Sequence, residues 1–322
     1  MNAILLFLLG FGLLYFGGEL LVKGSVALAL RLRISTLVVG MTIVSFATSA
    51  PELFVSLQAS LKGYPNITLG NVIGSNIVNV ALVLGLAAFL FRFKLTSQIR
   101  KTSYPVMLAS SIILGFILYS FKSISTSVGF VFIALLILFG TLLIRQSRKD
   151  YLKADIDNDS LLEQERLMSI YKSILYLLVG LILLKLGADY FVDGAVILAK
   201  IFKVSDRIIA ITIVAVGTSI PELATTVVAT IKKEENLAVG NLIGSNIFNI
   251  LAVLGFTAII QDIPLLELDE KLFRLDYTFM MISTLLLGLF IYVFSKKQIS
   301  RLEGSFLLLV YISYILFIFY PC

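Results

Sequence analysis

The chain has 322 residues, of which 59% are hydrophobic and only 14% are charged, and its mean hydropathy is +1.00. Apolar runs of about 20 residues recur along it, the length that a helix needs to cross a bilayer, so an ordinary soluble domain is excluded. There is no histidine and one cysteine, Cys322. These counts exclude an intramolecular disulfide, a histidine proton relay and a histidine-ligated zinc. We interpret the net charge of +6 through its placement along the chain, not as a signal for nucleic acid.

Apolar runs bounded by charged or turn residues predict an all-α polytopic membrane protein with ten transmembrane helices. We expect these at 2–24, 34–61, 67–91, 103–121, 124–145, 168–200, 206–231, 238–260, 273–295 and 303–320. The first run lacks a basic start and an evident cleavage site, so we interpret it as a helix and not as a signal peptide. The one long polar segment, 147–167, is predicted to be a cytoplasmic linker between five-helix repeats at 1–146 and 168–322.

The placement of basic residues predicts the orientation. If the N-terminus lies outside, most of the 26 Lys and Arg residues fall in cytoplasmic connections, as the positive-inside rule requires. We therefore expect a multi-pass protein of the plasma membrane with both termini extracellular.

The two halves of the chain repeat each other. "FATSAPELF" (46–54) matches "VGTSIPELA" (216–224), and "GNVIGSNIVN" (70–79) matches "GNLIGSNIFN" (240–249), at a constant offset of 170 residues. Because each half has an odd number of helices, the second half must enter the membrane inverted. Inverted repeats are a transporter architecture with the substrate site near the midplane.

Each repeat places a proline and a glutamate inside an apolar helix. Pro51 has no N–H, so it leaves a helical carbonyl without its partner, which in a bilayer is tolerated where the backbone lines a cavity. Helical spacing puts polar residues on one face of the first copy: Ser45, Thr48, Ser49, Glu52 and Ser56. The second copy repeats this with Thr218, Ser219, Glu222 and Thr226. The following helices offer Asn71, Ser75 and Asn79, then Asn241, Ser245 and Asn249.

Together these residues supply carboxylates, hydroxyls, amide oxygens and freed carbonyls, which are the hard oxygen ligands that Ca²⁺ prefers. Single hydroxyls could instead bond their own helix, a lone proline could be only a kink, and Asn76 and Asn246 could join helices. An intramembrane glutamate is by default a functional-site hypothesis. Two at repeat-related positions, Glu52 and Glu222, favour ion binding.

Two other acidic features are weaker. Glu19 and Asp189 could form a secondary site, pair with Lys23 and Lys185, or anchor the interface, and we favour a structural role. The segment 155–165, DIDNDSLLEQE, resembles the start of a calcium loop but lacks its glycine and its terminal glutamate, so we interpret it as a solvated linker.

The paired motifs resemble the α-repeats of the cation/Ca²⁺ exchanger superfamily, and most closely its prokaryotic sodium/calcium exchangers. The resemblance covers all ten predicted helices. It implies that helices two, three, seven and eight surround a site that Ca²⁺ and Na⁺ occupy alternately, and that helices one and six slide past the others to switch access. It also implies a transporter and not an enzyme, with no cofactor.

The resemblance also assigns roles to individual residues. It implies that Glu52 and Glu222, with the carbonyls of Thr48 and Thr218, bind Ca²⁺. It implies Na⁺ ligands at Ser49, Ser219, Ser75 and Ser245 and at the backbone of Ser45 and Ala215. Asn79 and Asn249 resemble the central polar pair. Some members, including potassium-dependent exchangers, have aspartate at the position of Asn249, so asparagine in both halves predicts K⁺-independent exchange.

The expected function is electrogenic Na⁺/Ca²⁺ antiport by alternating access, with the protein acting as a monomer. A Ca²⁺/H⁺ antiporter is the alternative within the superfamily. A Ca²⁺-permeable channel is the alternative of a different class, because channels also use carboxylates and broken helices.

Overall fold

The computed structural model describes residues 3–154, 168–202, 215–265, 270–294 and 298–319. Within these ranges eight helices are long and apolar enough to cross a membrane, and a ninth span results if Thr36–Thr48 and Ala50–Leu61 are counted together. Ile220–Ile231 is a shorter apolar helix. The predicted all-α membrane fold is confirmed, although the start of the predicted helix 206–231 and the segment 155–167 lie outside the described residues.

The chain divides into two compact units, and each draws on both halves of the sequence. The first comprises Met1–Thr48 and Phe139–Asn241, and the second comprises Ser49–Leu138 and Leu242–Cys322. Each half of the sequence therefore contributes to both spatial units. The predicted boundaries at 146 and 168 mark instead where one sequence repeat ends and the next begins.

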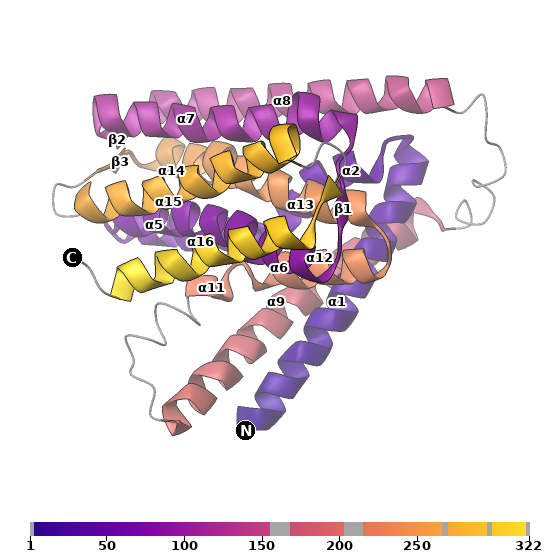
Figure 1. Cartoon of the computed structure of the whole chain (residues 1–322), viewed down its shortest axis with the longest axis horizontal. Coiled ribbons are helices and arrows are strands. Elements are labelled where there is room, and N and C mark those ends of the chain that lie inside the picture. The colour runs from indigo at the N-terminus through magenta and orange to yellow at the C-terminus, as the bar shows by residue number, and fades with distance from the viewer. Residues whose placement is uncertain (1–2, 155–167, 203–214, 266–269, 295–297, 320–322) are drawn as a thin grey trace. The chain divides into compact units, whose positions relative to one another are not determined.

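The first unit is built on two long helices, α1 (Ala3–Leu32) and α9 (Ile170–Ile201), which lie side by side (Figure 1). A Cβ added at Gly10 would lie 2.8 Å from Gly187 O, and one at Gly17 would lie 2.9 Å from Gly180 O. As the residue number rises in α1 it falls in α9, so the helices are antiparallel and approach backbone to backbone at glycines.

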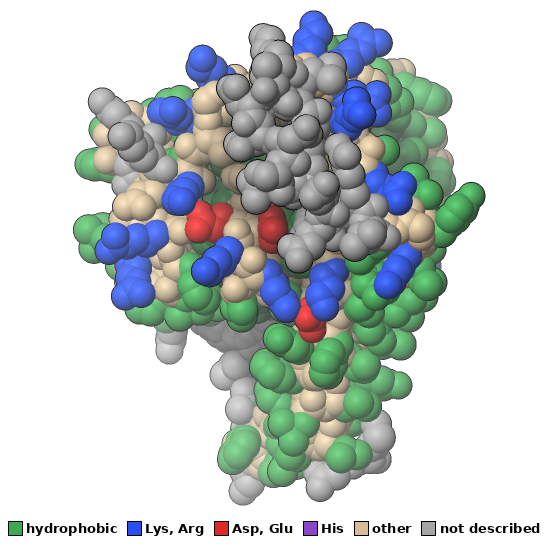
Figure 2. All heavy atoms as spheres, turned by 90° about the vertical axis from the view of Figure 1, so that its right-hand side faces the viewer, with side chains coloured by type: hydrophobic (Ala, Val, Ile, Leu, Met, Phe, Trp, Pro, Cys, Tyr) green, Lys and Arg blue, Asp and Glu red, His purple; other side chains and the backbone are tan. Residues whose placement is uncertain are grey.

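The first unit also contains several short helical segments and parts of α8 and α13. They are α2 (Thr36–Val39), the π-helix η1 (Gly40–Val44), α3 (Ser45–Thr48), the end of α8 (Thr126–Ala154), α11 (Ala215–Gly217), α12 (Ile220–Ile231) and the start of α13 (Glu235–Phe248). Both α9 and α12 contact α1. Figure 2 shows hydrophobic side chains over the part of the view that α1 and α9 form, and α1 exposes Leu5, Leu8 and Phe11, as a lipid-facing surface requires.

Two helix ends differ from the predicted boundaries. The first helix was expected to end at residue 24, but α1 continues to Leu32. The reason is packing: a Cβ at Gly24 would lie 2.8 Å from Ser173 O, so this glycine allows close approach to α9 and does not end the helix. The fifth helix was expected to end at 145, but α8 continues to Ala154 into the predicted linker.

The second unit contains most of the remaining helices. The helical elements are α4 (Ala50–Leu61), α5 (Pro65–Ile77), η2 (Val78–Leu84), α6 (Gly85–Leu90), η3 (Ile99–Ser103), α7 (Tyr104–Phe121), η5 (Asn249–Val253), α14 (Leu254–Ile260), α15 (Glu270–Leu289), η7 (Phe290–Phe294) and α16 (Arg301–Phe319), together with the start of α8 and the end of α13. The described residues also contain short strands that were not predicted: β1 (Phe93–Lys94) pairs antiparallel with β4 (Gln298–Ile299), and β2 (Ser123–Ile124) with β3 (Ile263–Pro264).

Candidate functional site

The predicted break in the glutamate-bearing helices is present in both repeats. In the first, α3 ends at Thr48 and α4 begins at Ala50, with Ser49 between them at φ −85° and ψ 5°. In the second, α11 ends at Gly217 and α12 begins at Ile220 after Ser219, at φ −92° and ψ 7°. Each proline therefore lies in the first turn of the second helix segment, where its missing N–H is tolerated.

The polar face predicted for the first repeat is buried. Ser45, Thr48, Ser49, Glu52 and Ser56 are each at most 1% exposed, whereas Phe46 and Phe54, between them in sequence, are 53% and 66% exposed. In the second repeat Ser219, Glu222 and Thr226 are fully buried and Thr218 is half-buried. Both glutamates thus lie away from solvent on helices that the sequence makes apolar elsewhere.

In the second unit, neighbouring side chains from α5 hold Glu52. Ser75 Oγ donates a hydrogen bond to Glu52 Oε1 at 3.4 Å, and Asn71 Nδ2 donates to the backbone carbonyl of Glu52 at 3.1 Å. Asn71 Nδ2 also lies 3.0 Å from Ser56 Oγ. The "APEL" and "GNxIGS" motifs of one repeat therefore meet at Glu52. The sequence predicted Ser75 in the site, but it did not show that Asn71 would contact Glu52.

In the first unit, motifs from opposite repeats meet. Thr48 Oγ1 donates to Asn241 Oδ1 at 3.1 Å, and Ser45 Oγ lies 3.0 Å from Asn241 O and 2.7 Å from Gly40 O. A Cβ added at Gly240 would lie 2.5 Å from Leu37 O, so glycine at this position of the motif allows α13 to approach α2. The hydroxyls of Thr48 and Ser75 each form a hydrogen bond with a residue of another helix. The alternative in which such hydroxyls bond only their own helix therefore does not describe these two residues.

A second amide cluster lies where π-helical segments interrupt the spans of the second unit. Asn79 lies in η2 and Asn249 begins η5, and π-bulges are frequent at functional sites. Asn249 Nδ2 donates to Asn76 Oδ1 at 3.1 Å, and Asn76 Nδ2 donates to Asn246 O at 3.4 Å. Asn76 therefore joins helices, as the alternative raised for Asn76 and Asn246 expected, whereas the side chain of Asn246 donates within its own helix, to Leu242 O. The helix α4, which carries Glu52, also contacts η5.

For two further predicted ligands, Ser245 and Ala215, the structure gives the position in the chain. Ser245 is fully buried in α13. Ala215 begins α11, and its side-chain environment is not described. The side chains of Glu52, Ser75, Asn79, Ser245 and Asn249 all belong to the second unit, whereas Ser45, Thr48, Thr218, Ser219, Glu222 and Ala215 belong to the first.

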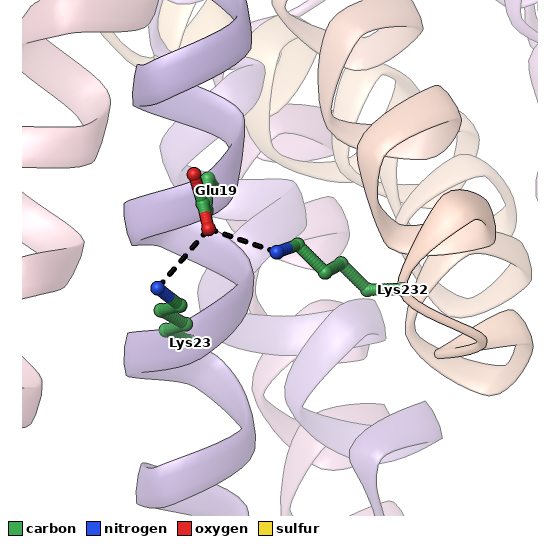
Figure 3. Close-up of polar contacts among 3 residues, drawn as sticks. All are labelled: Glu19, Lys23 and Lys232. Carbon is green, nitrogen blue, oxygen red and sulfur yellow. Dashed lines mark hydrogen bonds and ion pairs between the residues drawn. The ribbon is translucent and has the colours of Figure 1, made fainter.

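The two weaker acidic residues form ion pairs with lysines, as one of the three alternatives for them predicted. Glu19 Oε1 lies 3.0 Å from Lys23 Nζ and 2.8 Å from Lys232 Nζ (Figure 3). Asp189 pairs with Lys185 on the same helix. The contact with Lys232 was not predicted. Lys232 Nζ donates a hydrogen bond to Glu19 Oε1, which joins the end of α12 to α1 and raises the pKa of Lys232.

The chain is similar to known proteins along most of its length. The family model for sodium/calcium exchanger protein matches residues 2–145 and 172–320. Inner membrane protein YrbG of Escherichia coli (strain K12) is 36% identical over 88% of this chain and 87% of its own length. Sodium/calcium exchanger MaX1 of Methanosarcina acetivorans is 31% identical over 98% of both.

A solved structure has the same fold. The sodium-calcium exchanger NCX_Mj, soaked with 10 mM Na⁺ and zero Ca²⁺, matches 99% of each chain with a TM-score of 0.80 and 31% identity. Other structures of that exchanger were soaked with Sr²⁺ or Ca²⁺. The family model matches each half of the chain separately, which confirms two repeated halves in a multi-pass membrane protein. The family is one of transporters and not of enzymes. The chain belongs to the sodium/calcium exchanger family of cation antiporters.

Proposed function

We propose that this protein exchanges Na⁺ for Ca²⁺ across the membrane by alternating access. The observation that carries the proposal is the complete burial of Glu52 and Glu222, at repeat-related positions, on interrupted apolar helices. Buried carboxylates are costly unless a cation or a proton neutralises them. Two carboxylates match the charge of one Ca²⁺, and the sodium/calcium exchangers similar to this chain support this choice of ions.

We propose the following ligands for the transported ions: the carboxylates of Glu52 and Glu222; the backbone carbonyls of Thr48, Thr218, Ser45 and Ala215; the hydroxyls of Ser49, Ser219, Ser75 and Ser245; and the amides of Asn79 and Asn249. Ca²⁺ takes six to eight oxygens, and the set offers enough of them without nitrogen or sulfur. Na⁺ ions compete for the same carboxylates. A carrier without cations leaves both charges in a low dielectric, which disfavours its transition and makes exchange obligatory.

Exchange of more than two Na⁺ per Ca²⁺ moves net charge, and we propose that transport is electrogenic. The membrane potential then contributes about 2.3 kcal/mol per charge per 100 mV. Asparagine at 249 supports K⁺-independent transport. We further propose that the protein works as a monomer in the plasma membrane with both termini outside, which the distribution of Lys and Arg along the sequence supports.

The test is Ca²⁺ uptake into Na⁺-loaded proteoliposomes diluted into buffer free of Na⁺ and K⁺. Wild-type protein should take up Ca²⁺ only when Na⁺ is inside. In a separate set of vesicles loaded with both Na⁺ and K⁺, a K⁺ diffusion potential set with valinomycin should change the rate. Glu52→Gln should abolish uptake. Glu303→Gln is the matched control and should retain uptake. Glu303 is also buried, at 5% exposure, but within the described part of the chain its carboxylate caps α16 by accepting hydrogen bonds from Ser300.

The alternatives predict different results. A Ca²⁺/H⁺ antiporter would be driven by a pH gradient and would be indifferent to internal Na⁺. A channel would give passive uptake that does not saturate and needs no counter-ion. Either result with wild-type protein would overturn the proposal.

A further inference from the structure

Four buried asparagines of the second unit form two repeat-related pairs with different contacts. Asn76 corresponds to Asn246, and Asn79 corresponds to Asn249, at the offset of 170 residues. All four are at most 3% exposed. Asn76 bonds Asn249, but Asn246 Nδ2 donates instead to Leu242 O of its own helix, at 2.8 Å. The repeat is therefore symmetric in sequence and asymmetric in hydrogen bonding at this point.

The partners of Asn76 determine which way its amide faces. Its Nδ2 lies 3.4 Å from Asn246 O and 3.8 Å from Met280 Sδ. A carbonyl oxygen and a thioether sulfur only accept hydrogen bonds, so the amino group must lie on this side. The Oδ1 of Asn76 then faces Asn249, which must present its own amino group to it.

The same constraint then applies to Asn249. Because its Nδ2 donates to Asn76, its Oδ1 points away from Asn76. Among the residues that the structure describes, this oxygen is fully buried and accepts no hydrogen bond. A buried carbonyl oxygen without a donor is a suitable ligand for a hard cation, whereas an amino group at that position would repel one.

We propose that Asn76 is a positioning residue for transport: it orients the Asn249 amide so that the carbonyl oxygen is available to the transported cation. The inference rests on the proposed function, because it assigns the orientation of one of the proposed ligands. Met280 and the Asn246 carbonyl fix Asn76, and Asn76 fixes Asn249. Asn79 has no such support, since neither polar atom of its side chain has a hydrogen-bond partner in the described part of the chain.

The repeat supplies a matched control. Asn76→Leu removes the acceptor for Asn249, and Asn246→Leu removes a repeat-related, equally buried amide that touches neither Asn79 nor Asn249 by a hydrogen bond. In Na⁺-loaded proteoliposomes, Asn76→Leu should raise the KM for Ca²⁺ about fivefold with little change in kcat, which is the effect of one hydrogen bond. Asn246→Leu should change the KM less than about twofold.

A double-mutant cycle separates positioning from general helix packing. If Asn76 acts through Asn249, Asn76→Leu should have no further effect on KM in an Asn249→Ala background. Additive effects, or equal effects of Asn76→Leu and Asn246→Leu, would overturn the inference. If Asn76→Leu does not fold, Asn76→Ser, which is too short to reach Asn249, replaces it in the same cycle with the same expectation.

The outcomes also separate this inference from the proposed function. Wild-type protein without Na⁺-dependent uptake would overturn both. Wild-type and Asn246→Leu proteins that exchange normally, with an additive Asn76–Asn249 cycle, would overturn only the positioning role of Asn76.

Discussion

Tyr104 and Tyr277 make the same contact in opposite directions. Tyr104 of α7 donates a hydrogen bond to Thr284 O of α15 at 3.1 Å, and Tyr277 of α15 donates to Ser111 O of α7 at 3.0 Å. Each hydroxyl also lies against a glycine of the other helix, Gly288 and Gly115 respectively. Gly115 and Gly288 are 173 positions apart in sequence, as are Tyr104 and Tyr277. The repeat therefore extends beyond the motif region, with a small insertion.

The first prediction concerns these glycines. A Cβ at Gly115 would overlap the hydroxyl of Tyr277, and the ring cannot withdraw without losing its hydrogen bond. Gly115→Ala and Gly288→Ala should each lower the free energy of unfolding by about 1–3 kcal/mol, the usual effect of overpacking. Because the chain has no tryptophan, unfolding is best followed by size-exclusion chromatography after heating in detergent.

Gly140→Ala is the control for this pair, since no described atom lies within 4 Å of a Cβ added there. It should leave the midpoint of thermal unfolding unchanged or slightly higher, because alanine favours helix. Equal losses at positions 115 and 140 would contradict the role assigned to the tyrosines.

The second prediction concerns the contact between α1 and α9. Gly17→Ala places a methyl group 2.8 Å from Leu184 N and 2.9 Å from Gly180 O, both backbone atoms that cannot rotate away. We expect a loss of about 1–3 kcal/mol of stability. Gly12→Ala, on the same helix with no described neighbour within 4 Å, should be neutral. The same heating assay compares the two, and a stable Gly17→Ala protein would show that the helices can separate at little cost.

The third prediction concerns the ion pair between Glu19 and Lys232. The hydrogen bond that Lys232 donates to Glu19 raises the pKa of Lys232. The contribution of this pair to stability is therefore present below the ordinary lysine pKa of 10.5 and is lost as pH rises above it. Glu19→Gln should therefore lower the unfolding temperature slightly at neutral pH, and the difference from wild type should vanish in strongly alkaline buffer.

Asp189→Asn is the control for Glu19→Gln. The Lys185–Asp189 pair lies within one exposed helix face, with side chains 55% and 50% exposed, so it should contribute almost nothing. High salt screens the ion pair, so it should also reduce the lowering of the unfolding temperature that Glu19→Gln causes. A Glu19→Gln effect that persists at alkaline pH would mean that Glu19 stabilises the protein through another contact.

Sequence reasoning was reliable where a residue type is costly in a membrane. Glu52, Glu222 and the two prolines stand out because a bilayer tolerates them only at special positions, and both breaks occur near the predicted residues. It failed where packing decides. Gly24 resembles a helix end in sequence but is a contact with α9, and the extension of the repeat to Tyr104 and Tyr277 was missed because three extra residues shift the offset.

Hydrogen-bond partners were the least predictable part of the site. Asn71 and Asn241 occupy the same position in the two copies of the repeat. Asn71 nevertheless contacts Glu52, whereas Asn241 contacts Thr48. A one-dimensional pattern gives the face of a helix but not the neighbour that the face meets. For the same reason the sequence could identify Asn76 only as a residue that joins helices.

The last prediction tests how strictly Asn76 specifies its neighbour. In Asn249→Asp a carboxylate oxygen replaces the amino group and faces Asn76 Oδ1, so two acceptors meet where one hydrogen bond of 3.1 Å stood. Asn76 cannot turn to compensate without placing its own oxygen against Asn246 O. The variant should lose about 1–3 kcal/mol of stability, the cost of unsatisfied buried polar groups.

Asn79→Asp is the matched control, because it adds the same charge at the repeat-related position but breaks no hydrogen bond within the described residues. Heating both variants in detergent should show the larger loss for Asn249→Asp. The charge alone cannot produce that difference, because both variants carry it. Equal unfolding temperatures would mean that the Asn76–Asn249 contact does not discriminate between an amide and a carboxylate, and that asparagine at 249 is set by ion chemistry alone.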